Sequence, residues 1–308
     1  MPDATAPSFI STAQYRRFAL AAAVLTLGFI SPLWKLLRFS VADDLHSYIP
    51  LMPFVSGYLI WTQKSKLPGK SVPARKLAAL FFAAGMAAAA VYWSVARSAT
   101  PATMENSLAL STGAWLLFLT GLGCWFLGGA TMRVLAFSFF LLVFMIPLPV
   151  FLRDGVETAL QHGSAAVAGW MFSVAGTPVF QDDLVFRLPG ISLKVAPECS
   201  GIHSTLVLFI TSLLAGKVIL RRPWTRAVLC LAVIPLALIR NGFRVFVLGQ
   251  LCMHVGPQMI DSPVHHHGGP LFFVLSLVPF FLLLYFLKKT ERTDAAGRCS
   301  NSKNQNEK

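Results

Sequence analysis

Charged side chains are scarce in this chain. Only 13% of its 308 residues are Asp, Glu, Lys or Arg, whereas 55% are apolar. Soluble globular domains average about 25% charged residues, so this composition argues against a soluble enzyme or a soluble binding module. We predict an all-α polytopic membrane protein.

Cysteine is also sparse, and no CxxC pair occurs. The five cysteines are Cys124, Cys199, Cys230, Cys252 and Cys299. Scattered single cysteines indicate neither a zinc site nor a disulfide framework, and we expect no metal and no other cofactor. We interpret Cys124, Cys230 and Cys252 as small buried hydrophobic residues, the usual state of a cysteine in a membrane helix.

Acidic residues are half as frequent as basic ones, 13 against 26, which gives a formal net charge of +13. Such a charge can indicate a nucleic-acid partner. Here, however, the Lys and Arg residues form short patches that flank apolar segments, where they contact lipid headgroups and orient the chain. We therefore expect a lipid bilayer, and no nucleic acid, as a partner.

Eight apolar segments approach the length of about 20 residues with which a helix crosses a bilayer core. They are residues 18–37, 47–62, 77–96, 108–128, 134–152, 200–220, 227–250 and 270–287, of which the second is the shortest. They make up a membrane domain over residues 18–287, between a cytoplasmic N-terminus, 1–17, and a polar tail, 288–308, that we expect to be cytoplasmic and disordered.

Basic residues occupy every second loop of this arrangement. They lie before the first segment and after the second, fourth, sixth and eighth, and include Arg16, Lys66, Arg133, Arg222 and Lys288. Cytoplasmic loops carry the excess of Lys and Arg, so we expect both termini on the inside.

The stretch 153–198 then lies outside the membrane and contains two patterns. Residues 156–176 mix apolar residues with three glycines and several polar side chains, which predicts an interfacial or re-entrant helix. Residues 177–197 alternate apolar and polar residues around a Pro-Gly pair, which predicts a small β-hairpin. The hairpin leads the chain to Cys199 at the outer membrane surface.

Polar side chains crowd the start of the sixth apolar segment, in the sequence "VAPECSGIHS" at 195–204. Cys199 lies where the helix begins, and the unpaired N–H groups and partial positive charge of a helix N-terminus favour a reactive thiolate. Ser200 adds a hydroxyl. Glu198 either tunes the thiol or caps the start of the helix.

Two arginines interrupt the seventh apolar segment, in "LALIRNGFRVFVL". Arg240 and Arg244 are four residues apart and share one helix face, with Asn241 beside them. An arginine in lipid costs at least a few kcal/mol, so each one requires a partner or a task. Snorkelling of the side chain to the outer headgroups is the alternative interpretation for both.

Three consecutive histidines, His265 to His267, precede the last apolar segment on the outer side. Adjacent histidines on an irregular loop point in different directions, which disfavours a metal site. An imidazole near Cys199 can instead take the thiol proton, while a guanidinium holds the oxyanion of a tetrahedral intermediate. His203, four residues after Cys199, is a rival base.

Three motifs carry these residues: "VAPECSGIHS", "IPLALIRNGFRV" and "VHHHGGPLFFVLSL". Together they resemble the exosortase/archaeosortase family of membrane cysteine transpeptidases. The segments "HSYIPLMPFVSGYLIW" at 46–61 and "FMIPLPVFL" at 144–152, with the expected hairpin, are also similar to family segments. The resemblance covers roughly residues 40 to 287.

The resemblance implies that Cys199 is the nucleophile and Arg244 the motif arginine. It also implies that His265 is the general acid or base, because His265 stands four residues before Gly269. His267 is the reserve within the histidine run. The resemblance assigns no role to Arg240.

For function, the resemblance implies a cysteine peptidase/transpeptidase in the bacterial inner membrane with its active site on the extracytoplasmic side. Such enzymes cleave the C-terminal sorting signal of exported proteins through a thioester acyl-enzyme. The signal consists of a short Pro-containing motif, often Pro-Glu-Pro, a transmembrane helix and a basic cluster. The alternatives are an anion transporter, disfavoured because no inverted repeat is visible, and a non-catalytic factor for envelope or exopolysaccharide assembly.

Overall fold

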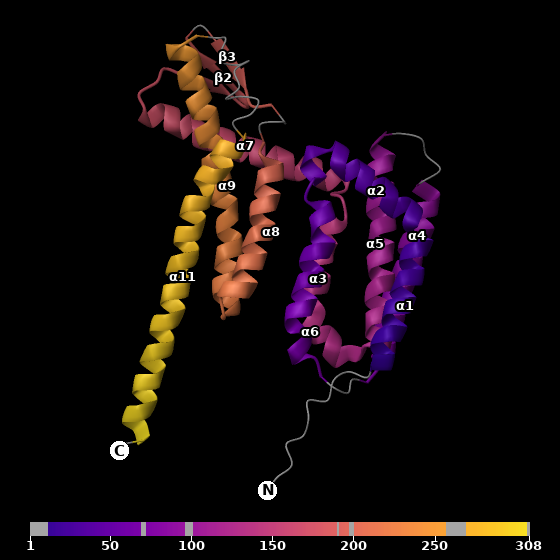
Figure 1. Cartoon of the computed structure of the whole chain (residues 1–308). Coiled ribbons are helices and arrows are strands. Elements are labelled where there is room, and N and C mark those ends of the chain that lie inside the picture. Colours follow the sequence, from indigo (N-terminus) through magenta and orange to yellow (C-terminus); the bar gives the residue numbers. More distant parts are fainter. Residues whose placement is uncertain are drawn as a thin grey trace. The chain divides into compact units, whose positions relative to one another are not determined.

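The structure is a computed structural model that describes residues 12–68, 72–95, 101–189, 191–196, 200–256 and 269–306. The chain divides into two compact units, residues 1–153 and 154–308, which we describe separately (Figure 1).

The first unit is helical throughout its described elements. Its α4 and α5 pack closely because glycines face aromatic rings: a Cβ on Gly85 would lie 3.0 Å from the Phe118 ring, and one on Gly121 would lie 2.8 Å from the Phe82 ring. The helices are α1 (Thr12–Gly28), α2 (Ile30–Ala42), α3 (Met52–Gln63), α4 (Arg75–Val95), α5 (Pro101–Phe126) and α6 (Gly128–Leu141). Short 3-10 turns are η1 (Asp44–His46), η2 (Ile49–Leu51), η3 (Lys64–Lys66) and η4 (Leu142–Met145).

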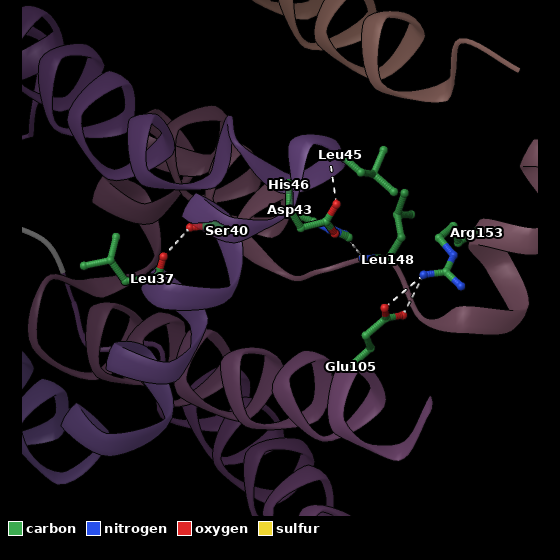
Figure 2. Close-up of polar contacts among 8 residues, drawn as sticks. All are labelled: Leu37, Ser40, Asp43, Leu45, His46, Glu105, Leu148 and Arg153. Carbon is green, nitrogen blue, oxygen red and sulfur yellow. Dashed lines mark hydrogen bonds and ion pairs between the residues drawn. The ribbon is translucent and has the colours of Figure 1, made fainter. Parts of the chain in front are cut away.

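A buried histidine joins two segments of the first unit that are far apart in sequence (Figure 2). His46 is fully buried; its Nδ1 lies 2.7 Å from an Asp43 carboxylate oxygen, and its Nε2 accepts the backbone N–H of Leu148 at 3.3 Å. Because Nε2 accepts, the proton of the neutral ring is on Nδ1 and is donated to Asp43. The two segments that resembled family sequences, around residues 46 and 148, are therefore in contact.

The described part of the second unit combines four helices with a small antiparallel sheet. The long helix α7 (Val150–Val174) begins in the first unit and leads to the strands. The strand order is β1-β2-β3, with Phe186 opposite both Gln181 and Leu193. The other elements are β1 (Phe180–Asp182), β2 (Val185–Leu188), β3 (Ile191–Lys194), α8 (Ile202–Ile219), α9 (Pro223–His254) and α11 (Gly269–Asn306).

Glycines on α9 bring α7 close to it. A Cβ on Gly242 would lie 2.7 Å from Val167, and one on Gly249 would lie 2.5 Å from the Phe172 ring. Phe172 and Phe186 are fully buried, so the sheet packs onto α7 and α9 through one apolar core. This packing confirms the expected helix and hairpin before the sixth apolar segment.

Six helices among the described residues are long and apolar enough to cross a membrane, and up to seven if a bent pair forms one span. The bent pair is α1 with α2, which meet at 71° and replace the single helix expected at 18–37. Pro32 explains the break, because a proline ring clashes with the carbonyl four residues earlier, that of Gly28. The segment expected at 47–62 forms only the 12-residue α3, too short for a span. Among the described residues, the candidate spans thus number six or seven, where the sequence suggested about eight.

The C-terminal segment corrects a second expectation. Residues 288–306, which we expected to be disordered, continue α11. Glu291 is only 8% exposed, and its carboxylate accepts the backbone N–H groups of Arg221 and Arg222 at 2.9 and 2.8 Å and the Thr225 hydroxyl at 2.5 Å. It therefore caps the N-terminus of α9 from a different helix, a contact that the polar composition of the tail concealed.

Replacing Glu291 with Ala is expected to lower the free energy of unfolding by about 2 kcal/mol, because two backbone donors and a buried hydroxyl lose a charged acceptor. Denaturant unfolding of the purified protein in one detergent measures this change. Arg292→Ala is the matched control, since Arg292 is adjacent and exposed. Equal stability of the two variants would contradict the capping role.

Candidate active site

The helices α8 and α9 form an antiparallel pair, and the end of the pair away from their connection carries the candidate site. Residues 220–222 join them, and the Ser212 hydroxyl lies 3.4 Å from the Cys230 sulfur partway along the pair. At the opposite end from the connection, the start of α8 meets Arg240 and Asn241 of α9. Residues about 40 positions apart in the sequence are therefore in contact at Ser200, the position that follows Cys199.

Gly201 adopts a backbone conformation that other residues avoid. Its φ is +68°, and a Cβ there would collide with the Asn241 side chain, whose Cγ is 2.7 Å away. Its carbonyl accepts the backbone N–H and hydroxyl of Thr205 at 3.0 and 2.8 Å, the Ser204 hydroxyl at 3.0 Å and a guanidinium N–H of Arg240 at 3.3 Å. Glycine at this position is therefore required both by the backbone and by the neighbouring helix.

Ser200 is held equally firmly. It is 1% exposed, and its carbonyl accepts a hydrogen bond from the Asn241 amide. Its hydroxyl lies 3.5 Å from a carboxylate oxygen of Glu157 on α7, a long hydrogen bond. The residue immediately after Cys199 thus has a fixed backbone and a polar environment.

The chain is also fixed just before Cys199. The Val195 N–H donates to the Leu184 carbonyl at 2.9 Å, and the Val195 carbonyl accepts the Gln161 amide at 3.3 Å. Val195 is 2% exposed. The sheet and α7 therefore hold Val195, and α9 holds Ser200 and Gly201.

Arg240 is part of this scaffold. It is 7% exposed, which contradicts the snorkelling alternative for this residue. It donates to the Gly201 carbonyl, to the Thr205 hydroxyl at 3.2 Å and to the Asn241 amide oxygen at 3.1 Å, all of them neutral acceptors. Its Nη1 is buried and has no hydrogen-bond partner within the described part of the chain.

Arg244 lies one helical turn further along α9 and is half-buried. Because α8 and α9 are antiparallel and Arg240 is level with the first turn of α8, Arg244 lies beyond the N-terminal end of α8. The ring of its neighbour Phe243 contacts that of Phe272 edge-on, with centroids 6.1 Å apart. The start of α11 is thus packed against the same part of α9.

A small apolar cavity of about 200 Å³ lies between α9 and α11 beside these residues. Arg240 and Ser276 contribute the polar groups of its wall, and Phe243 and Phe272 contribute aromatic ones. The cavity is smaller than a typical ligand pocket of at least about 300 Å³ and is suited to a single side chain.

Four predicted site residues lie outside the described residues: Glu198, Cys199, His265 and His267. Among the others, the structure brings Ser200, Arg240 and Asn241 together. His203 lies in the first turn of α8 and has a buried Nδ1 without a hydrogen-bond partner among the described groups.

The remaining cysteines agree with a packing role. Cys124 and Cys252 are buried and Cys230 is half-buried, and none of the three forms a disulfide. No group of three His, Cys, Asp or Glu residues within the described ranges is arranged to hold a metal ion.

Sequence reasoning missed Glu157, Gln161 and Thr205 as parts of the site. The first two had a visible signal, because they are polar residues on one face of a helix that was otherwise expected to lie at the membrane interface. Thr205 had none, since a hydroxyl that binds the carbonyl four residues earlier is common in apolar helices.

These features define a polytopic membrane protein with a polar site where a transmembrane helix begins. A comparison with known families matches residues 34–282 to the family described as transmembrane exosortase (Exosortase_EpsH). The chain belongs to this family. No curated protein and no solved structure matches the chain.

Gly201→Ala is expected to lower the free energy of unfolding by about 1–3 kcal/mol, because alanine disfavours a positive φ and its methyl group displaces Asn241. Thermal unfolding in detergent measures the change. Gly155→Ala is the control, since a Cβ on Gly155 meets no atom within 4 Å. A Gly201→Ala protein as stable as the Gly155→Ala protein would contradict this account.

Proposed function

We propose that the protein is a membrane-embedded cysteine peptidase/transpeptidase that cleaves the C-terminal sorting signals of exported proteins, with Cys199 as nucleophile. Membership of the transmembrane exosortase family supports the class of protein. The observation that carries the proposal for this chain is the double clamp of Asn241 and Arg240 on the carbonyls of Ser200 and Gly201. It fixes the backbone next to the proposed nucleophile.

The chemistry of the clamp suits an acyl transfer. A fixed backbone limits the motion of the adjacent side chain, which lowers the entropy cost of attack. The first N–H groups of α8 have no partners within the helix and carry partial positive charge at this end. Arg240 and Arg244 add two guanidinium groups on the same face of α9, and this positive environment favours a thiolate and an oxyanion.

The proposed reaction has two steps. In the first, the Cys199 sulfur attacks the scissile carbonyl carbon, a C–S bond forms and the C–N bond breaks, while His265 passes the thiol proton to the leaving amine. In the second, water or an amine acceptor attacks the thioester, the C–S bond breaks, and the proton of the acceptor returns through His265 to the sulfur. His267 is the alternative proton carrier.

The proposed substrate is anchored by its own transmembrane helix. A short Pro-containing motif precedes that helix and a basic cluster follows it, so the positive-inside rule places the motif at the outer surface. We place the active site on the same, extracytoplasmic side of the bacterial inner membrane. A scissile bond held at a fixed depth by the lipid then meets the nucleophile by lateral diffusion alone.

Cys199→Ala is expected to abolish substrate processing, with a loss of at least about 1,000-fold, since a nucleophile acts only through its own atom. The assay follows cleavage of a co-expressed tagged substrate on an immunoblot and captures the thioester as a hydroxylamine-sensitive adduct of the wild-type protein. Cys299→Ala, in the polar C-terminal sequence, is the control and is expected to process normally. Normal processing by the Cys199→Ala protein excludes the proposal.

Substitutions of the two arginines are expected to affect processing and thermal stability differently. Arg244→Gln is expected to reduce processing about 100-fold or more, as loss of an oxyanion donor does, with little change in melting temperature. Arg240→Gln is expected to lower both the processing rate and the melting temperature, because Arg240 donates hydrogen bonds to three protein oxygens in the folded state. Melting curves and processing rates of both variants measure this. If Arg240→Gln leaves the melting temperature unchanged, its structural role is wrong.

A further inference from the structure

An apolar groove of about 630 Å³ runs between α4, α5 and α6 in the first unit. Its wall is made by aliphatic and aromatic side chains such as Leu77, Phe81, Leu116, Met132 and Phe139. Among its described lining residues, Arg133 carries the one charge and Thr120 the one hydroxyl. The groove belongs to the first unit, whereas the α8–α9 site belongs to the second, and the proposed reaction does not use it.

One end of the groove is strongly basic. Arg133 lines this end and is exposed, and Arg75 lies 5.9 Å above the Trp125 ring. Two backbone hydrogen bonds fix the start of α4 to the corner between α5 and α6: Ala74 N–H to the Cys124 carbonyl at 3.0 Å, and Gly129 N–H to the Val72 carbonyl at 3.4 Å. Arg75 and Arg133 therefore belong to the same end of the unit.

No acidic side chain in the neighbouring sequence compensates this charge. The chain contains no Asp or Glu between Asp44 and Glu105, and none between Glu105 and Asp154. Tryptophan beside arginine is also the pairing found where a helix leaves the hydrocarbon core for the headgroup layer. The basic end is thus suited to an anion at headgroup depth.

We propose that this groove binds an anionic phospholipid, with one acyl chain between α5 and α6 and the phosphate at Arg133. From Arg133 to Ile146 at the far end of the groove, thirteen residues at 1.5 Å each span about 20 Å. One leaflet is about half of a hydrocarbon core of about 30 Å. The groove is therefore long enough to hold one acyl chain of one lipid.

Charge favours a lipid over a substrate helix. The basic cluster of a sorting signal and the basic end of the groove are assigned to the same side of the membrane, so they repel each other. A zwitterionic lipid has the same acyl chains, but its headgroup places a cation next to Arg133, which weakens binding.

The test uses the full-length protein purified in a neutral detergent. Native mass spectrometry measures binding of phosphatidylglycerol and phosphatidylcholine with identical acyl chains. We expect the anionic lipid to bind more tightly, and Arg133→Gln to reduce that preference about fivefold, the effect of one basic residue at an anionic surface. Arg38→Gln is the matched control, because Arg38 is exposed and stacks on Trp34 away from the groove.

A second measurement locates the acyl chain. Phosphatidylglycerol with a photoreactive diazirine on one chain is expected to cross-link to residues 113–124 and 132–140, and Ala136→Phe is expected to abolish these cross-links by filling the groove. Ala136 is exposed, so the larger side chain displaces no core residue.

Several outcomes overturn the proposal: equal binding of both lipids, equal effects of Arg133→Gln and Arg38→Gln, or unchanged cross-links in Ala136→Phe. Competition by soluble glycerol phosphate would indicate a free-phosphate site instead. Cross-links to a substrate helix in place of the lipid would assign the groove to the substrate. Substrate processing is a separate readout, so the lipid site and the proposed activity fail independently.

Discussion

Two hydrogen bonds between helices organise the candidate site: Asn241 to the Ser200 carbonyl and Arg240 to the Gly201 carbonyl. Both carbonyls precede the helical part of α8, and both donors are on α9. A buried guanidinium is costly in a low-dielectric environment, so it is tolerated because several oxygens surround it. The buried Arg240 guanidinium stabilises the turn at Gly201 by donating to its carbonyl. In return, the start of α8 supplies the acceptors that make burial of Arg240 tolerable.

Much of the fold follows from the sequence through apolar length and charge. The spans after residue 77 are long enough to be recognised, and the alternating pattern after residue 176 predicts the sheet. The errors have physical causes. Pro32 breaks an apolar run that hydropathy alone treats as continuous, and α3 is preceded by 3-10 turns that shorten its helix. Glu291 was assigned to a disordered tail because composition does not reveal a contact with a distant helix end.

The site was less predictable than the fold, and Arg240 shows why. Spacing placed it on the same face as Arg244, but spacing cannot distinguish an arginine that reaches the headgroups from one that binds a neighbouring helix. That distinction depends on the register of α8 and α9, which the connection at 220–222 sets. Glu157 and Gln161 were visible as polar residues on one helix face, but their contacts with Ser200 and Val195 could not be predicted, because these contacts require α7 to pack against the start of α8 and the end of the sheet.

The cap that Glu291 places on α9 has a consequence for biosynthesis. Ribosomes make the chain from its N-terminus, so α8 and α9 are synthesised before Glu291. Until then the first amides of α9 depend on water or lipid headgroups for hydrogen bonding. The base of the α8–α9 pair that carries the clamp is therefore completed only after residue 291 has been translated, and chains terminated before that residue lack this closure.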